Sequence, residues 1–225
     1  MRYRLLTATA ALLASFLLPT GAAQAAEPTC SRPQSDAEAI EVLTYLGWED
    51  ASLQVAIRAH PAVTEDQLTA VRRAITTWNE VLQQCLDGEV SLTYVQGRSG
   101  AHADIVVNLL PRPAGGVLFS GVAVCTNKQC RNVIVSTVPP PGSAFTALST
   151  EEVYRLALHE LGHALGLGHA TNIESYDVMG YGGLDDETSF VISQCDVEAL
   201  AYIWSWALDG TEPTRPTDPI FECSG

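Results

Sequence analysis

The chain has 225 residues, and its 26 Asp and Glu outnumber its 12 Lys and Arg, which gives a formal net charge of −14 at pH 7. Nucleic acid is excluded as a partner, because phosphate binding relies on clustered basic residues and the sequence contains no run that could supply them. The length suits one soluble domain.

The first 25 residues have the pattern of a secretory signal peptide. Arg2 and Arg4 precede an apolar run, residues 5–18, and an A-x-A cleavage site ends at Ala25. The run is short for a membrane span, so we expect cleavage near Ala25, with a retained anchor as the alternative. Loss of the two arginines would leave a mature chain of charge −16. We expect it to be secreted, extracellular, monomeric and not bound to membranes.

Residues 26–50 are expected to be an N-terminal extension, either a short pro-segment or a brace, with apolar residues at mostly helical spacing. A catalytic domain is expected at residues 51–209. Polar and apolar residues alternate from 53 to 59, which predicts a strand. A capping box at Thr64 then starts a long amphipathic helix that runs to about Cys85. Further strands are expected at residues 90–94, 103–110, 117–124 and 132–138.

The second half of the domain is organised around a shorter helix. A Pro-Pro-Pro-Gly run breaks the strand pattern and a second capping box begins at Ser149, which predicts a helix from about residue 150 to 165. After a glycine-rich stretch, Ser193 precedes a last helix with apolar residues facing inward. Residues 210–225 contain three prolines and are expected to form an extended C-terminal tail.

Residues 159–169 read HELGHALGLGH, a pattern typical of a zinc site. On a helix, His159 and His163 lie one turn apart on the same face. Gly166 can end the helix in a left-handed cap, and the reversal that it allows brings His169 to the same point. A catalytic zinc ion takes three protein ligands and keeps a fourth position open, so the pattern predicts one catalytic zinc ion.

Glu160 follows the first of these histidines but points to another side of the helix. There it can take a proton from water instead of binding the metal. The alternative is a helix that carries histidines on a partly buried face without any metal. The full pattern, with its glycines and third histidine, favours the zinc site.

Six cysteines lie beyond the predicted leader, and an oxidising compartment would pair them into three disulfides. Fifteen pairings are possible for six cysteines. We expect the pair Cys125–Cys130 across a turn-like tetrapeptide, whereas Cys30 and Cys223 could each fix one end of the chain to the body. The candidates are Cys30, Cys85, Cys125, Cys130, Cys195 and Cys223.

The dense acidic cluster Asp185-Asp186-Glu187 is either a calcium site or a solvated acidic loop. The sequence leaves both open.

With these residues in place, the chain resembles the metzincin zinc endopeptidases, in which a methionine turn follows the zinc helix. Met179 stands ten residues after His169 within DVMGY, and GHALGLGH is most similar to the matrixin branch. The resemblance covers about residues 51–207. It implies an α+β zincin fold: a twisted, mixed five-stranded sheet, a long backing helix, an active-site helix and a C-terminal subdomain with one helix. Met179 would form an apolar floor under the imidazoles.

Two departures from the matrixin pattern concern latency and structural zinc. Residues 26–50 are short for a prodomain and lack the zinc-blocking cysteine motif, although Cys30 could bind zinc as a thiolate instead of pairing. His60 and His102 are the other histidines, and each suits a surface or capping position. The structural zinc site of vertebrate matrixins therefore has no counterpart here.

Two further departures lie near the third histidine. Tyr181 stands two residues after Met179, where astacins and serralysins carry a tyrosine that reaches the metal and matrixins carry proline. It could donate a hydrogen bond to the oxyanion or pack in the turn. Ala170 matches none of the common family markers for the residue after the third histidine.

The site and the resemblance predict a secreted zinc endopeptidase that cleaves a protein or peptide lying along an edge strand. Glu160 is the expected general base. The alternative is a secreted zinc-binding module of the same fold without protease activity, and hydrolysis of another kind of bond is also left open. Glu160 argues against a purely structural site, which has no need of a base.

Overall fold

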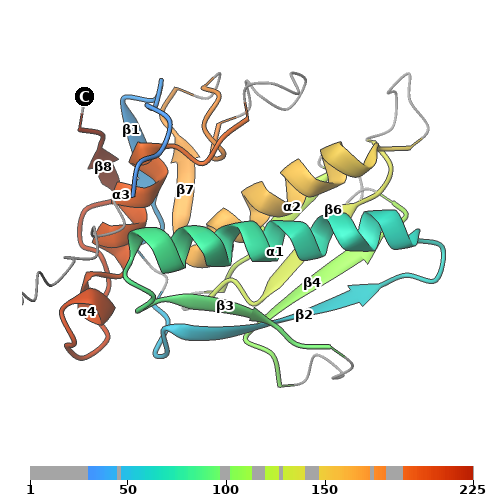
Figure 1. Ribbon diagram of the computed structural model, residues 1–225, viewed down its shortest axis with the longest axis horizontal. Helices are drawn as coiled ribbons and strands as arrows, with labels where there is room; N and C mark the ends of the chain where they lie inside the picture. Colours follow the sequence, from blue (N-terminus) through green and yellow to red (C-terminus); the bar gives the residue numbers. More distant parts are fainter. Residues whose placement is uncertain are drawn as a thin grey trace, which may run out of the picture.

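The computed structural model describes residues 30–44, 47–96, 102–112, 120–126, 129–139, 147–172, 175–180 and 190–224. The predicted leader lies outside these residues. The described chain combines two sheets with four helices in one α+β arrangement (Figure 1). Within the described part of the chain, no helix combines the length and the apolar character that crossing a lipid bilayer requires.

Five strands form the main sheet, in the spatial order β3-β2-β4-β6-β5. Neighbouring strands are parallel except β5, which is antiparallel to β6 and forms one edge. The predicted mixed five-stranded sheet is therefore confirmed. The strands are β2 Ser52–Ala59, β3 Ser91–Tyr94, β4 Ile105–Leu110, β5 Gly121–Val124 and β6 Asn132–Ser136.

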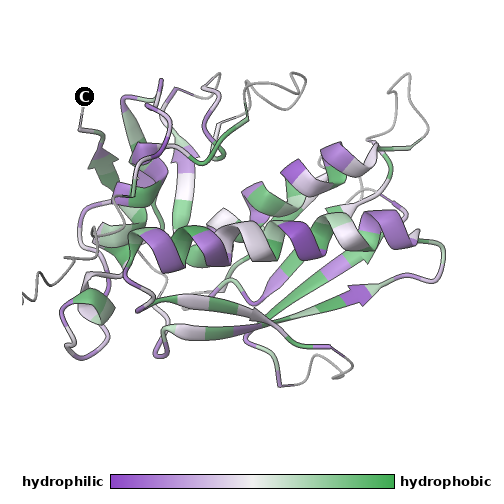
Figure 2. Ribbon diagram, in the orientation of Figure 1, coloured by the Kyte–Doolittle hydropathy of each residue, from purple (hydrophilic) through white to green (hydrophobic). Residues whose placement is uncertain are grey.

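Two long helices, α1 (Glu65–Cys85) and α2 (Thr150–Leu165), lie side by side against the sheet (Figure 1). Both begin with the predicted capping boxes, because the Thr64 and Ser149 side chains accept hydrogen bonds from backbone N–H groups of the first turn. Hydrophilic and hydrophobic bands alternate along both helices in Figure 2, as expected for helices that bury one face. Helix α1 packs on β3 and helix α2 on β5 and β6.

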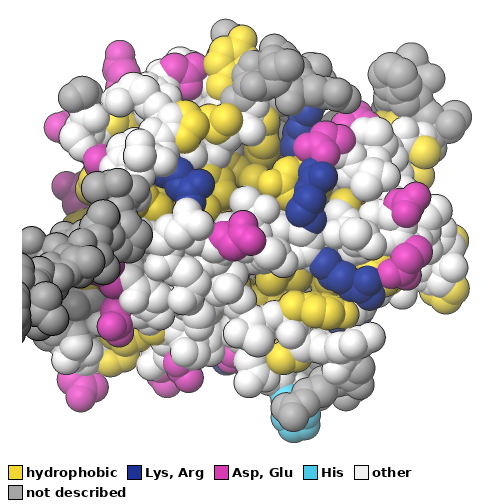
Figure 3. Space-filling view, viewed as in Figure 1, with side chains coloured by type: hydrophobic (Ala, Val, Ile, Leu, Met, Phe, Trp, Pro, Cys, Tyr) yellow, Lys and Arg dark blue, Asp and Glu magenta, His cyan; other side chains and the backbone are white. Residues whose placement is uncertain are grey.

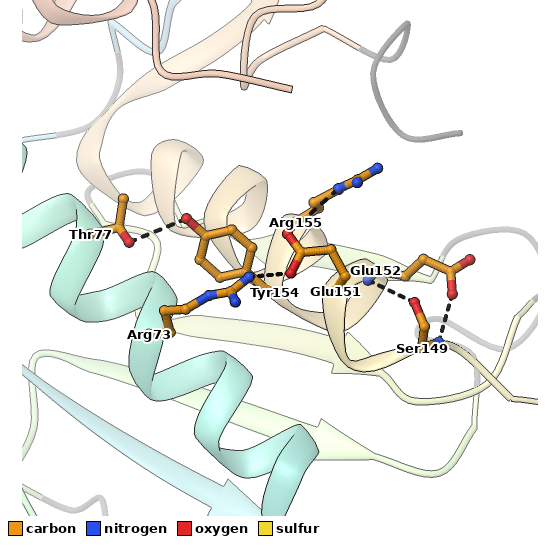
Figure 4. A network of polar contacts seen from close by, with 7 residues as sticks. All are labelled: Arg73, Thr77, Ser149, Glu151, Glu152, Tyr154 and Arg155. Atoms are coloured by element: carbon orange, nitrogen blue, oxygen red, sulfur yellow. Dashed lines mark hydrogen bonds and ion pairs between the residues drawn. The ribbon is translucent and has the colours of Figure 1, made fainter. Parts of the chain in front are cut away.

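A polar network joins the two helices near the start of α2 (Figure 4). The Arg73 guanidinium lies 3.5 Å from the centre of the Tyr154 ring and forms an ion pair with Glu151. The hydroxyl groups of Thr77 and Tyr154 are 3.2 Å apart. Deeper in the interface, the Trp78 indole donates to the carbonyl of Leu158 at 2.8 Å. Helix α2 is thus fixed to α1 along its first three turns.

A second sheet of three strands has the order β7-β1-β8, and β1 is antiparallel to both neighbours. Its strands are β1 Ala39–Val42, β7 Leu167–Ala170 and β8 Ile220–Glu222. The helical spacing of apolar residues within 26–50 is misleading for Ala39–Val42, because pairing with two distant strands overrides the local pattern in so short a segment. The predicted extended tail likewise ends in a strand, β8.

The C-terminal part contains the predicted helix, α3 (Gln194–Ile203), followed by a short helix, α4 (Ser205–Leu208). Three disulfides are present, and all six cysteines take part in them. The predicted Cys125–Cys130 pair closes the β5–β6 hairpin. The others link Cys30 to Cys85 and Cys195 to Cys223, so both ends of the described chain are tied to helices.

Candidate metal centre

Helix α2 and strand β7 together present the three histidines of the sequence motif. His159 and His163 lie one turn apart on α2, which ends at Gly166. Gly166 has φ +111°, a left-handed conformation that favours glycine, and the chain then turns into β7. His169 lies on β7 and meets the other two from a different direction. The helix bounds and the glycine cap agree with the sequence prediction.

The three imidazoles converge on one point. One possible ligand atom from each of His159, His163 and His169 lies within 4.8 Å of the others. The ring centres are 4.8, 5.4 and 4.7 Å apart. Among the described residues, this is the one group of three or more His, Cys, Asp or Glu side chains placed to share a metal ion.

Backbone carbonyls determine which nitrogen faces the centre of this cluster. The Nδ1 atom of His159 lies 2.7 Å from the carbonyl oxygen of Val178, and that of His163 lies 2.8 Å from the carbonyl oxygen of Leu167. A carbonyl oxygen only accepts, so each Nδ1 carries the proton and donates. The lone pairs on both Nε2 atoms are therefore available to a cation.

The electrostatic environment keeps the imidazoles neutral. Burial lowers the pKa of His159 to about 3 and that of His163 to about 4. Burial also lowers the pKa of His169, while the negative charge of Glu41 acts in the opposite direction. Neutral imidazoles with defined tautomers are the form that binds zinc, so the donor set fits this metal.

Met179 is fully buried and lies against helix α2. A Cβ atom added to Gly162, between the two helical histidines, would lie 2.4 Å from the Met179 sulfur. The Met179 carbonyl accepts from the N–H of Ala170, next to His169, at 3.0 Å. The turn thus contacts both segments that carry the histidines, as expected for an apolar floor.

Glu160 lies on the inner side of the edge strand β5. It is almost fully buried, and a Cβ atom added to Gly121 would lie 2.5 Å from its Oε1. Its Oε2 atom has no hydrogen-bond partner in the described structure. Burial raises the pKa of Glu160 to about 8, and a hydrogen bond with the backbone of Ala123 opposes this shift. One carboxylate oxygen, Oε1, thus lies against strand β5, and Oε2 is the oxygen without a hydrogen-bond partner.

Two buried aspartates support the methionine turn. Asp177 Oδ2 accepts from the Ser35 hydroxyl at 2.8 Å and the Ala37 N–H at 3.2 Å, so it links the turn to the N-terminal segment. Asp196 accepts from the backbone of Val178 in the turn, its Oδ2 accepts from the Ser193 N–H at 2.8 Å, and burial raises the pKa of Asp196 to about 8. Neither residue was singled out from the sequence, where an isolated Asp in a turn or at a helix start looks like an ordinary cap.

Two predicted features fall outside the described residues: Tyr181 and the acidic cluster Asp185-Asp186-Glu187. The face shown in Figure 3 carries described Lys and Arg side chains interspersed with Asp and Glu. Sequence reasoning also missed Gly121 and Glu41. A glycine in an edge strand and a glutamate in an N-terminal extension carry no signal of a metal centre until the fold brings them to it.

Comparison with known proteins finds a matching family model and matching relatives. The Matrixin family model matches residues 143–205, which include all three histidines and Met179. Matrix metalloproteinase-18 of Xenopus laevis is 29% identical over 160 residues, 68% of this chain and 32% of that protein. Interstitial collagenase of Bos taurus is 34% identical over 67 residues, 30% of this chain and 14% of that protein. The chain therefore spans a third or less of the length of these two relatives.

Solved structures give weaker likenesses. Archaemetzincin from Methanopyrus kandleri has a TM-score of 0.44 and 21% sequence identity, over 67% of this chain and 94% of that one. Myroilysin has a TM-score of 0.40 and 14% identity, over 81% of this chain and 78% of that one.

Proposed function

We propose that this chain carries a matrixin-like metzincin domain and is a secreted zinc metalloendopeptidase that hydrolyses peptide bonds in extended substrates. The observation that carries the proposal is the convergence of three neutral imidazoles beside a buried carboxylate with one unpartnered oxygen. His159, His163 and His169 would hold one zinc ion. Zinc bound there supplies Lewis acidity, which lowers the pKa of water and polarises a carbonyl group.

Glu160 is the proposed general base. Its free Oε2 would take a proton from the attacking water and deliver it to the nitrogen of the leaving amine. Burial favours the protonated carboxyl group and so makes both halves of this transfer accessible near neutral pH. A purely structural zinc site has no use for a buried carboxylate in this position.

The edge strand β5 is the proposed docking site for the substrate backbone. In the sheet that the described residues form, β5 lies at one end of the strand order, so one of its sides is not paired to another of these strands. An extended peptide can add to such an edge through main-chain hydrogen bonds. Helix α2 packs against β5, and Gly121 of β5 contacts Glu160, so a peptide along this edge would pass the proposed base.

Export to an oxidising compartment is part of the proposal. The three disulfides support it, since such bonds form and persist in secreted proteins. The predicted signal peptide at residues 1–25 would direct the export. N-terminal sequencing of the protein recovered from the culture medium tests this directly, and retention of the whole chain inside the cells would contradict it.

The decisive experiment is Glu160→Ala. The variant should bind about one zinc ion, like the wild type, yet lose cleavage of casein by roughly two to four orders of magnitude, the contribution typical of general acid-base catalysis. Zinc content by atomic absorption and casein fragments on gels, with and without a chelator, measure both properties. Undiminished cleavage would refute the general-base role. A wild-type protein that binds zinc but never cleaves would instead indicate the zinc-binding module.

Tyr181 is proposed to donate a hydrogen bond to the developing oxyanion. Tyr181→Phe removes the hydroxyl group alone, so turnover should fall while zinc content and KM stay constant. The kinetic constants on a quenched fluorescent peptide measure this split. Unchanged turnover would assign Tyr181 to packing in the turn.

A further inference from the structure

The N-terminal strand β1 holds the segment that carries the third histidine. The N–H of Leu43 donates to the carbonyl of Gly166 at 2.9 Å, just before β7. The N–H of Thr171, just after β7, donates to the carbonyl of Ala39 at 3.0 Å. His169 lies between these two bonds. Strand β1 therefore fixes the backbone on both sides of this histidine.

Glu41 lies at the centre of this contact. Ile40 pairs with Ala170 and Val42 with Leu167, and the register shifts between them. A Cβ atom added to Gly168 would lie 2.5 Å from the Glu41 Cβ and 3.0 Å from its carbonyl carbon and oxygen. The residue before His169 is thus in direct contact with the main chain of Glu41, at a distance that only glycine allows.

The Glu41 side chain also places a negative charge near His169. Glu41 is exposed, and its Cβ lies against the backbone of Gly168, so its carboxylate extends from a point next to His169. A negative charge near a bound divalent cation favours the binding of that cation. The backbone contact of Glu41 and its negative charge thus both act at His169.

Disulfides make β1 a permanent part of the molecule. Cys30, upstream of β1, is bonded to Cys85 at the end of α1. On its other side β1 pairs with β8, which Cys223 links to Cys195 on α3. Cleavage of the chain between β1 and β2 would leave the strand attached through Cys30. This segment is consequently better described as a brace than as a removable pro-segment.

We propose that Glu41 is a positioning residue of the metal centre: it orients the backbone that presents His169 and supplies negative charge beside this ligand. Glu41 acts through His169 and does not contact the substrate. The proposal rests on the proposed function only in assigning His169 as a zinc ligand.

The test compares Glu41→Gln with Glu222→Gln. Glu222 is also exposed, lies on β8 in the same sheet and pairs with Ala39, so its replacement removes an equal charge away from His169. Zinc affinity is measured by competition with a chromophoric chelator at neutral pH and low ionic strength. Glu41→Gln should weaken zinc binding roughly tenfold, as loss of a partner to a metal ligand typically does. Glu222→Gln should leave it unchanged.

Three further measurements separate positioning from general stability. Glu41→Asp keeps the charge and should recover part of the lost affinity. With Co2+ in place of zinc, the visible absorption bands, which report ligand geometry, should change in Glu41→Gln and not in Glu222→Gln. The difference between Glu41→Gln and wild type should shrink in about 1 M salt, where the Debye length falls to roughly 3 Å.

Equal zinc affinity in Glu41→Gln and wild type would overturn the proposal. Equal weakening in both Gln variants would overturn it too, because the effect would then be one of net charge. These outcomes differ from failure of the proposed function. A wild-type protein that binds no zinc refutes the zinc enzyme itself, whereas zinc binding without casein cleavage refutes only the peptidase activity.

Discussion

Two buried histidines make the metal-free protein sensitive to acid. The folded pKa values, about 3 for His159 and about 4 for His163, lie below the ordinary value of 6.5. Below pH 6.5 the unfolded chain therefore binds protons that the folded chain does not, and the free energy of unfolding must fall as the pH drops. Urea unfolding of the metal-free protein should show this loss between pH 6.5 and about 4.

The exposed His60 provides the control for this experiment. Its Nδ1 accepts from the N–H of Ala62 at 3.1 Å at the protein surface, as expected for a capping histidine. His60→Gln removes one exposed imidazole without touching the three histidines of the metal centre, so its profile shows what the loss of any one histidine does. A flat profile for the wild-type protein across the same window would contradict the burial of neutral imidazoles.

Asp196 produces the opposite dependence. Burial raises its pKa from 3.8 to about 8, so between these values the folded state holds a proton that the unfolded state has released. Its contribution to the free energy of unfolding must therefore decrease as the pH rises through this window. Asp196→Asn carries no titrating proton and should lose less stability than wild type toward pH 8. Parallel unfolding profiles for the two proteins would contradict this assignment.

At the scale of elements, helix α2 and the methionine turn meet at Gly162. A Cβ atom there would lie 2.4 Å from the Met179 sulfur and 3.4 Å from a Trp78 ring carbon. Gly162→Ala should destabilise the protein by roughly 1–3 kcal/mol through overpacking, despite the better helix propensity of Ala. It should also weaken zinc binding, because the displaced turn carries the carbonyl that orients His159. Urea unfolding and chelator competition measure the two effects.

A double variant checks that Met179 transmits the effect. If the clash is the cause, Gly162→Ala combined with Met179→Ala should be no less stable than Met179→Ala alone. Additive losses would show that Gly162 matters for another reason.

Elements whose signals are local were predictable from the sequence. The caps at Thr64 and Ser149 and the helix end at Gly166 depend on residues within one or two turns, and the structure confirms them. Strand β1 was not predictable, because Ile40 becomes a strand residue only by pairing with Ala170 and Phe221. Short strands take their structure from partners, and no local pattern identifies partners so far along the chain.

In the candidate site, too, local features were predictable from the sequence and features that depend on tertiary packing were not. Spacing on one helix is enough to bring His159 and His163 together, so the motif predicted their meeting. The groups that tune them come from other elements: the Val178 carbonyl sets the tautomer of His159, and Gly121 contacts Glu160. Such neighbours depend on the packing of β5 and the methionine turn against α2, which the sequence does not reveal.

At the scale of the whole molecule, the disulfides differ in the length of chain that they close. The Cys30–Cys85 bond spans 55 residues and the Cys125–Cys130 bond spans 5. In the chain-entropy account, replacing the first pair by Ala should cost about 4 kcal/mol and the second about 2 kcal/mol. Urea unfolding of the two double variants measures the difference. Equal losses would show that effects in the folded state outweigh loop length.

The order of strands in the small sheet also has a consequence for folding. Strand β1 leaves the ribosome early, but its partner Ala170 follows 130 residues later and Phe221 later still. Contacts between such distant segments close slowly. Hydrogen bonds within α1 and pairing of β2 with β4 can form while β1 still has no partner. We therefore expect refolding chains to regain helical circular dichroism before they can retain zinc, so that metal capture marks the last step of assembly.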